Sequence, residues 1–136
     1  MTVTGEEKRE ISLADFVGEY RRLDYTDMTN PKPDLSDSTK STLTATDDGF
    51  SFSASLVMAT GDVVNIGPIQ IKDSDMTYKK EYKEATESYS YTLKYTLNNG
   101  GYISFERSEW GGYEYWLGMD YKQGAESYLE AMVKVS

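Results

Sequence analysis

Glu106 and Glu109 are the residues of this sequence that come closest to acid–base chemistry, because they stand among aromatic side chains in FERSEW, residues 105–110. On a strand, alternation places Glu106 on the face of Trp110 and Glu109 on the opposite face. A carboxylate that faces inward loses hydration, which raises its pKa and lets it act as a general acid unless a base such as Arg107 pairs with it. Glu106 is therefore the candidate catalytic residue. The alternative is that Glu106 is an ordinary surface carboxylate that faces solvent and has no catalytic role.

Other chemistry is limited by composition, since the chain has no histidine and no cysteine. This excludes Ser-His-Asp and Cys-His catalysis, disulfides and thiolate metal sites. The aspartate pairs lack the spacing of a calcium-binding loop, and no glycine-rich phosphate loop is present. We expect no metal and no organic cofactor. Whether the protein is an enzyme stays open; if it is one, a cofactor-free cyclase or isomerase is the class that remains.

Charge and hydropathy narrow the partners. The sequence has 23 acidic and 14 basic residues, a net charge of −9, which disfavours nucleic acid and favours a basic protein as macromolecular partner. No run of 18 apolar residues predicts a membrane span, and the first residues do not resemble a signal peptide. A cytoplasmic location is expected, although a secreted chain cut after its signal peptide would have the same sequence.

Aromatic residues are concentrated in RSEWGGYEYWLGMDY, residues 107–121, and the chain has twelve tyrosines against four phenylalanines. Such a run can form core, the wall of a ligand pocket or a surface for a partner. A dry core favours phenylalanine, because each buried tyrosine hydroxyl needs a polar partner. The tyrosine content therefore favours a wet or ligand-filled cavity over a dry core, and tyrosines at the surface of a barrel would meet the same requirement.

Hydrophobic alternation predicts the elements that position these residues. A period of two is clear in residues 50–58 and 89–97, and Asn-Asn-Gly-Gly at residues 98–101 is a strong hairpin signal. Gly67-Pro68 predicts a bulge or an edge strand. Residues 76–88 fit a helix or a strand and turn, and their flanks favour the strand and turn. We count eight or nine strands joined by short turns.

Sequential hairpins without a long crossover predict an all-β fold, an antiparallel up-and-down β-barrel of about eight strands with a short N-terminal helical turn after Ser12. A two-sheet sandwich is the alternative. We expect a flexible N-terminal arm over residues 1–11 and a single β-barrel domain over residues 12–136.

This order of elements resembles the lipocalin and calycin group of barrels. In that group a Gly-x-Trp motif near the start of the first strand seals one end of the barrel, and Gly18-Glu19-Tyr20 occupies the corresponding place here. Tyrosine replaces tryptophan, and the sealing arginine near the last strand has no counterpart, since the last arginine is Arg107. The resemblance is architectural and does not imply a subfamily.

Three functions remain. The first is binding of a small apolar or aromatic ligand inside the barrel, with a pocket wall formed by the apolar faces of central strands: Met58, Tyr91, Tyr95, Tyr115, Leu117 and Met119. The second is a protein-binding inhibitor or immunity module that uses its acidic surface with Trp110 and Trp116. The third is cofactor-free catalysis in the pocket, with Glu106 or a tyrosine hydroxyl polarising a carbonyl.

Overall fold

The computed structural model describes residues 9–24, 26–27, 29–58, 60–98, 100–110, 112–123 and 126–135, without the side chains of Trp110, Gln123, Glu126 and Tyr128. The strands are β1 (Gly18–Asp24), β2 (Lys32–Pro33), β3 (Lys40–Thr46), β4 (Gly49–Val57), β5 (Val63–Ile71), β6 (Thr77–Lys83), β7 (Ser88–Thr96), β8 (Tyr102–Trp110), β9 (Tyr113–Gln123) and β10 (Glu126–Lys134). Two 3-10 turns are present among these residues, η1 (Leu13–Phe16) and η2 (Asp73–Asp75). In this part of the chain no helix is long and apolar enough to cross a membrane.

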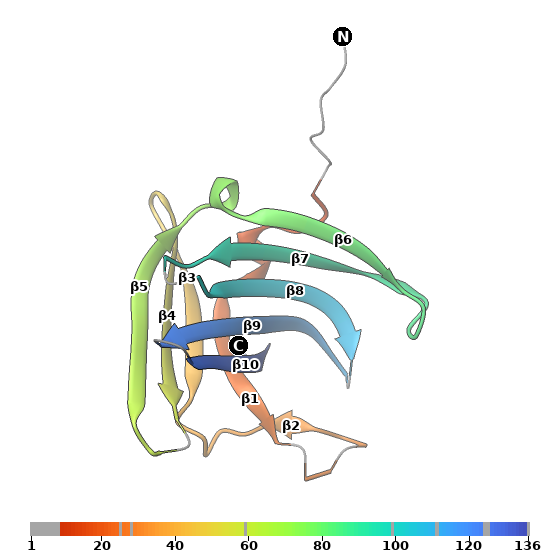
Figure 1. Ribbon diagram of the computed structural model, residues 1–136. Helices are drawn as coiled ribbons and strands as arrows, with labels where there is room; N and C mark the ends of the chain where they lie inside the picture. The colour runs from red at the N-terminus through yellow and green to blue at the C-terminus, as the bar shows by residue number, and fades with distance from the viewer. Residues whose placement is uncertain are drawn as a thin grey trace.

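Nine strands pair in one antiparallel path, β5-β4-β3-β1-β10-β9-β8-β7-β6, and β2 pairs with β1. The sheet curls strongly, so that β3, β4 and β5 form one wall and β6 to β10 run across it (Figure 1). The prediction of an all-β antiparallel fold is confirmed. Because β5 and β6 end the path and pair with nothing further among the described strands, the sheet is a half-barrel and not the closed barrel that we predicted. The expected N-terminal helical turn is a single 3-10 turn, η1.

The two edge strands explain why the sheet ends where it does. Pro68 in β5 has no N–H to donate, and the register between β4 and β5 shifts between Phe52 and Ala54, opposite Gly67-Pro68. The predicted bulge and the predicted edge strand are both confirmed. β6 carries three lysines in seven residues, and charged lysines are a common protection of an exposed edge against further pairing.

The inner face of the sheet, defined by the buried residues Phe52, Leu93, Phe105 and Leu117, encloses the core; we call the opposite face the outer face. Phe105 lies at the centre of the core. Its ring centroid is 5.4 Å from that of Phe16 and 6.1 Å from that of Phe52. η1 places the Phe16 side chain inside the curved sheet. There it packs on Phe105, and these rings help to fill the space between the two walls. The largest fully buried side chains are Tyr20, Phe16, Phe52, Phe105, Leu13, Leu43, Leu56, Ile71, Leu93, Ile103, Leu117 and Met119.

Tyr20 is the single tyrosine among these fully buried side chains, and its hydroxyl donates a 2.7 Å hydrogen bond to the Phe16 carbonyl oxygen. Burial, with a smaller effect of Tyr115, raises the pKa of Tyr20 far above its usual range, so the side chain stays neutral. The segment before β1 is held against the rest of the fold. The Leu13 N–H donates to Asp73 Oδ1 at 2.8 Å, and Ile11 is only 3% exposed. Residues 1–8 of the expected N-terminal arm lie outside the described residues.

Candidate functional site

A groove of about 450 Å³ opens between the outer face of β8 to β10 and the turn that follows β6. This volume falls within the range of about 300–1,000 Å³ that is typical of ligand pockets. Apolar atoms form more of its surface than polar atoms do. Its lining residues are Ser104, Glu106, Ser108 and Glu109 of β8, Trp116, Leu117 and Gly118 of β9, Ala131 of β10, and Lys83, Ala85 and Thr86.

The groove exists because small residues stand side by side on three neighbouring strands. Gly118 pairs directly with Ser104 on one side and with Ala131 on the other. A Cβ atom at position 118 would lie 2.7 Å from Ser104 Oγ, so the hollow depends on the missing side chain. Next to it, the Trp116 indole N–H donates to the Ser108 carbonyl oxygen at 2.9 Å, which orients the large ring along the groove.

The polar groups of the groove include two carboxylates. Glu106 is the cross-strand partner of Trp116, and Glu109 lies at the rim. Lys83, also in the lining, is held in a 2.8 Å ion pair with Glu81. Glu106 faces outward, because Ile103 and Phe105 take the inner face of β8. Chemically, the site offers an apolar floor, an indole and carboxylate oxygens, which suits a molecule with a flat apolar body and a hydrogen-bond donor.

The six residues predicted to line an interior pocket do share the inner face, but no described cavity is shared by them. Leu117 and Met119 are each 1% exposed, and the other four, Met58, Tyr91, Tyr95 and Tyr115, pack at the edge of the core. Between the walls of the sheet, the Phe16 and Phe105 rings pack with their centroids 5.4 Å apart. Of the six, Tyr91 and Leu117 line cavities composed of described residues, and these are two different cavities.

Of the two tryptophans predicted as a partner surface, the structure describes the side chain of one, Trp116. Trp116 lines the groove, with its ring centroid 6.2 Å from that of Tyr113. The Trp110 side chain lies outside the described residues. Among the described residues, Tyr82 and Tyr89 are also exposed aromatic side chains, at 51% and 50%, at the far end of β6 and β7. The sequence gives no sign of this exposure, because both alternate with residues that pack on the core.

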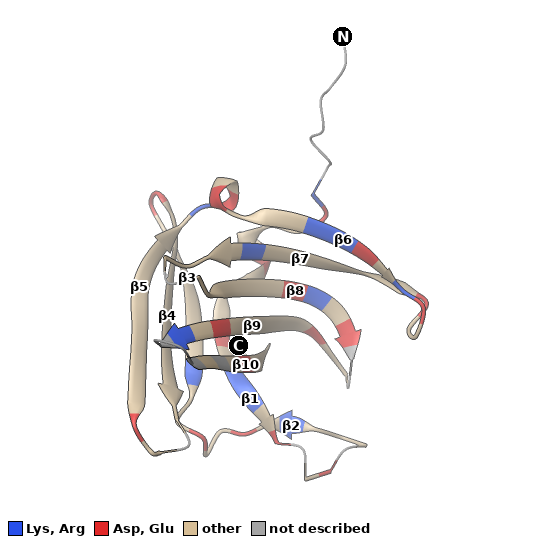
Figure 2. Cartoon of the chain, in the orientation of Figure 1, with Lys and Arg blue, Asp and Glu red and all other residues tan. Residues whose placement is uncertain are grey.

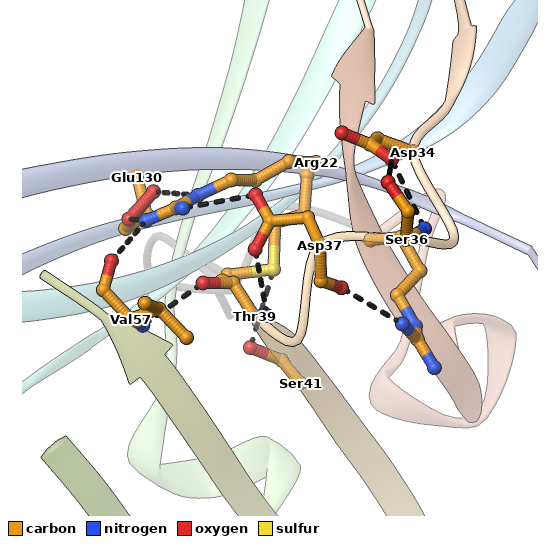
Figure 3. Close-up of polar contacts among 10 residues, drawn as sticks. Arg22, Asp34, Ser36, Asp37, Thr39, Ser41, Val57 and Glu130 are labelled. Carbon is orange, nitrogen blue, oxygen red and sulfur yellow. Dashed lines mark hydrogen bonds and ion pairs between the residues drawn. The ribbon is translucent and has the colours of Figure 1, made fainter. Parts of the chain in front are cut away.

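A cluster of charged groups fastens the other end of the half-barrel. The Arg22 guanidinium lies between Glu130 and Asp37 and also donates to the Val57 carbonyl oxygen (Figure 3). Its Nε is 2.8 Å from Glu130 Oε1, and its Nη1 is 3.0 Å from Asp37 Oδ2. The cluster joins β1, β4, β10 and the loop before β3. With every partner hydrogen-bonded in this way, its role is structural.

Acid should weaken this cluster. Burial raises the pKa of Asp37, but the backbone N–H of Thr39 and the Arg22 guanidinium outweigh burial and lower the pKa below its usual 3.8. A carboxyl whose pKa is lower in the folded state stabilises the fold fully above its unfolded pKa and loses that contribution as pH falls through the folded pKa. We expect the free energy of unfolding, measured with urea, to fall below about pH 4. In Asp37→Asn this acid-dependent loss should be smaller; an unchanged pH profile would contradict the assignment.

Aspartates elsewhere serve turns and caps. Asp24 and Asp27 accept hydrogen bonds from the backbone N–H groups of Thr26 and Thr29. Among the described residues, no group of three or more Asp or Glu side chains is placed to hold a metal ion. Comparison of the chain with protein-family models, curated proteins and solved structures found no match. The groove and the chemistry of its residues are therefore the features of the protein that bear on function.

Proposed function

We propose that the protein binds a small apolar or aromatic molecule in the outer groove over Trp116. The observation that carries the proposal is the hollow of about 450 Å³ beside an oriented indole. Ligand sites are concave, mostly apolar and supplied with a few placed polar groups, and the groove has these properties. We therefore place the ligand on the outside of the sheet and not in the interior pocket that the sequence suggests. The reason is that buried aromatic and aliphatic side chains form the core.

The experiment is a titration with the neutral dye N-phenyl-1-naphthylamine, followed by dye and tryptophan fluorescence. We expect saturable one-to-one binding that changes the emission of Trp116. In Ala131→Phe, a ring enters the groove from an exposed strand position, and the dye should bind about tenfold more weakly or worse, a change of about 1.4 kcal/mol.

Leu129→Phe is the matched control. Leu129 lies two residues earlier on the same strand and the same face, is 73% exposed, and is not part of the groove lining. Its dye affinity should equal that of the unchanged protein. Equal binding by all three proteins would move the site elsewhere, and no binding to the folded wild-type protein would refute the proposal.

A second candidate is docking of a protein partner. The packed interior and the half-exposed pair Tyr82 and Tyr89, with ring centroids 5.2 Å apart, support it. Exposed aromatic side chains are frequent anchors of interfaces, and the acidic net charge favours a basic partner. Tyr82→Ser with Tyr89→Ser would abolish such an interaction while leaving dye binding in the groove intact.

We also propose that the lipocalin and calycin resemblance describes the architecture. The antiparallel strand path and the buried Tyr20 of Gly18-Glu19-Tyr20, hydrogen-bonded to the turn before it, support this. The Tyr20 ring centroid is 6.3 Å from that of Phe105, so Tyr20 packs in the core near the start of β1, where the group's sealing residue also lies. The test is Tyr20→Trp, which should fold with similar stability if the position is equivalent; a loss of the folded state would oppose the resemblance.

A further inference from the structure

Cations and tyrosine rings alternate in a row on the inner face of β6 to β10. Backbone pairing sets Tyr91 between Lys80 and Arg107, and Arg107 between Tyr91 and Tyr115. The Arg107 guanidinium carbon is 5.1 Å from the Tyr91 ring centroid, and Lys80 Nζ is 5.8 Å from it. Lys134 Nζ is 5.4 Å from the Tyr115 ring centroid, which extends the row to β10. Figure 2 shows basic residues on the neighbouring strands β6, β7 and β8 of this acidic protein.

Arg107 has hydrogen-bonding capacity that no described residue uses. Among the described residues, no carboxylate or carbonyl oxygen accepts a hydrogen bond from its guanidinium, and no ion pair involves it. Arg22, by contrast, is engaged by three partners. A guanidinium carries five N–H donors in a planar fork that matches a carboxylate or a phosphate. Cation–π contact with Tyr91 orients the fork but uses none of these donors.

The guanidinium lines a cavity of about 330 Å³. Tyr89 and Tyr91 form its aromatic wall, and Ser88, Ser108, Glu109 and Glu114 complete its lining. This volume lies near the lower end of the range of about 300–1,000 Å³ for ligand sites, so a molecule of one or two rings fits best. Among the described residues, the cavity and the outer groove share Ser108 and Glu109 alone, at the irregular register between Arg107 and Trp110.

We propose that this cavity is a second binding site, which takes a small aromatic carboxylate. The carboxylate accepts two hydrogen bonds from Arg107, and the ring lies against Tyr89 and Tyr91. Glu109 and Glu114 favour a monoanion over a dianion such as a phosphate monoester, because their repulsion grows with the charge of the ligand. Lys80, 4.6 Å from the Tyr89 ring centroid, adds positive potential at the same edge.

The test uses benzoate, with benzamide and phenyl phosphate as comparison ligands. Binding is followed in ¹H–¹⁵N spectra through the Arg107 Nε–H and the Tyr91 amide. We expect saturable shifts of both signals with benzoate, and at least about tenfold weaker binding of benzamide, which lacks the charge. Phenyl phosphate should also bind more weakly than benzoate. Stronger binding of phenyl phosphate would overturn the proposed selection for one charge.

Two variants separate the fork from the charge. Arg107→Met should lose benzoate binding, and Arg107→Lys, which keeps the charge but not the planar fork, should weaken it about threefold or more. Lys94→Met is the matched control, because Lys94 lies 4.5 Å from the Tyr102 ring centroid, outside the cavity, and its loss should leave affinity unchanged. Equal affinity in all three variants, or shifts spread over every basic residue, would overturn the site.

The proposal does not depend on the outer groove. Ala131→Phe should bind benzoate as the unchanged protein does, since Ala131 does not line the Arg107 cavity. Failure of the dye titration would therefore leave the benzoate result standing, and failure of benzoate binding would leave the groove standing.

Discussion

Replacing Phe105 with alanine should lower the free energy of unfolding by about 3–5 kcal/mol, the largest loss that we expect from a single substitution in this protein. Phe105 is fully buried and its ring lies 5.4 Å from Phe16, 6.1 Å from Phe52 and 6.3 Å from Tyr20. Because these side chains come from η1, β1 and β4, the cavity left by the deletion cannot close through one local shift. Urea unfolding at constant temperature measures the loss, and the melting temperature should fall by about 10–20 °C.

Phe50→Ala gives the matched comparison, because it deletes the same ring at a partly buried position on β4. Its cost should be less than half that of Phe105→Ala. A loss below about 1 kcal/mol for Phe105→Ala would mean that the ring borders an open space and does not fill the core. That outcome would return the interior pocket to consideration.

Arg22→Met should cost about 1–3 kcal/mol. Removing the guanidinium leaves two carboxylates, Glu130 and Asp37, facing each other without a counter-charge, and it also removes the bond to the Val57 carbonyl oxygen. Removal of one partner from a fully buried pair costs about 3–5 kcal/mol, whereas exposed pairs contribute about 0–1 kcal/mol. These side chains are between those limits, with 28% exposure for Arg22, 22% for Asp37 and 12% for Glu130.

The double substitution Arg22→Met with Glu130→Leu tests the cause of that loss. It removes the guanidinium and one of the two carboxylates left unpaired, so the double variant should be more stable than Arg22→Met alone. A double variant no more stable than Arg22→Met would show that the unpaired charge of Glu130 does not cause the loss. Urea midpoints at neutral pH for the three proteins decide between these explanations.

Much of the fold could be predicted because strand alternation is a local signal. Residues 50–58 alternate as expected, with Phe52 and Leu56 fully buried. In residues 89–97 Leu93 is fully buried as expected, whereas Tyr89 is half exposed and Ser90 is buried. The strand and turn over residues 76–88 are confirmed by β6 and the turn that follows it. Closure of the barrel could not be predicted in the same way, since it depends on whether β5 and β6 meet. Pro68 and the lysines of β6 favour edges, and the sheet stays open.

β10 shows why pattern alone does not identify a face. Leu129 and Ala131 share a face by alternation, yet that face is the outer one, and Leu129 is 73% exposed. The inner face carries Glu130 beside the buried Met132. An inward carboxylate is tolerated because Arg22, 108 residues earlier in the sequence, pairs with it. No local rule could supply that partner.

The candidate site was predicted in its residue types more than in its location. Trp116 and Glu106 were named for separate hypotheses, and the structure pairs them across β8 and β9 in one groove. The hollow created by the small residues Gly118 and Ala131 could not be predicted from the sequence. A small residue in a strand does not indicate which residues are its cross-strand neighbours. The sequence indicates Arg107 only as a partner for a carboxylate, whereas the structure sets it against Tyr91, and no described residue accepts a hydrogen bond from its guanidinium.

The most direct test of the groove is an intermolecular NOE experiment with N-phenyl-1-naphthylamine and protein labelled at alanine and methionine methyl groups. The groove and the core each have a reporter, because Ala131 lines the groove, whereas Met119 and Met132 are buried on the inner face. We expect NOEs from the dye to the Ala131 methyl group and none to Met119 or Met132. NOEs to Met119 and Met132 without one to Ala131 would show that the dye enters the core, and would contradict a packed interior with an external site.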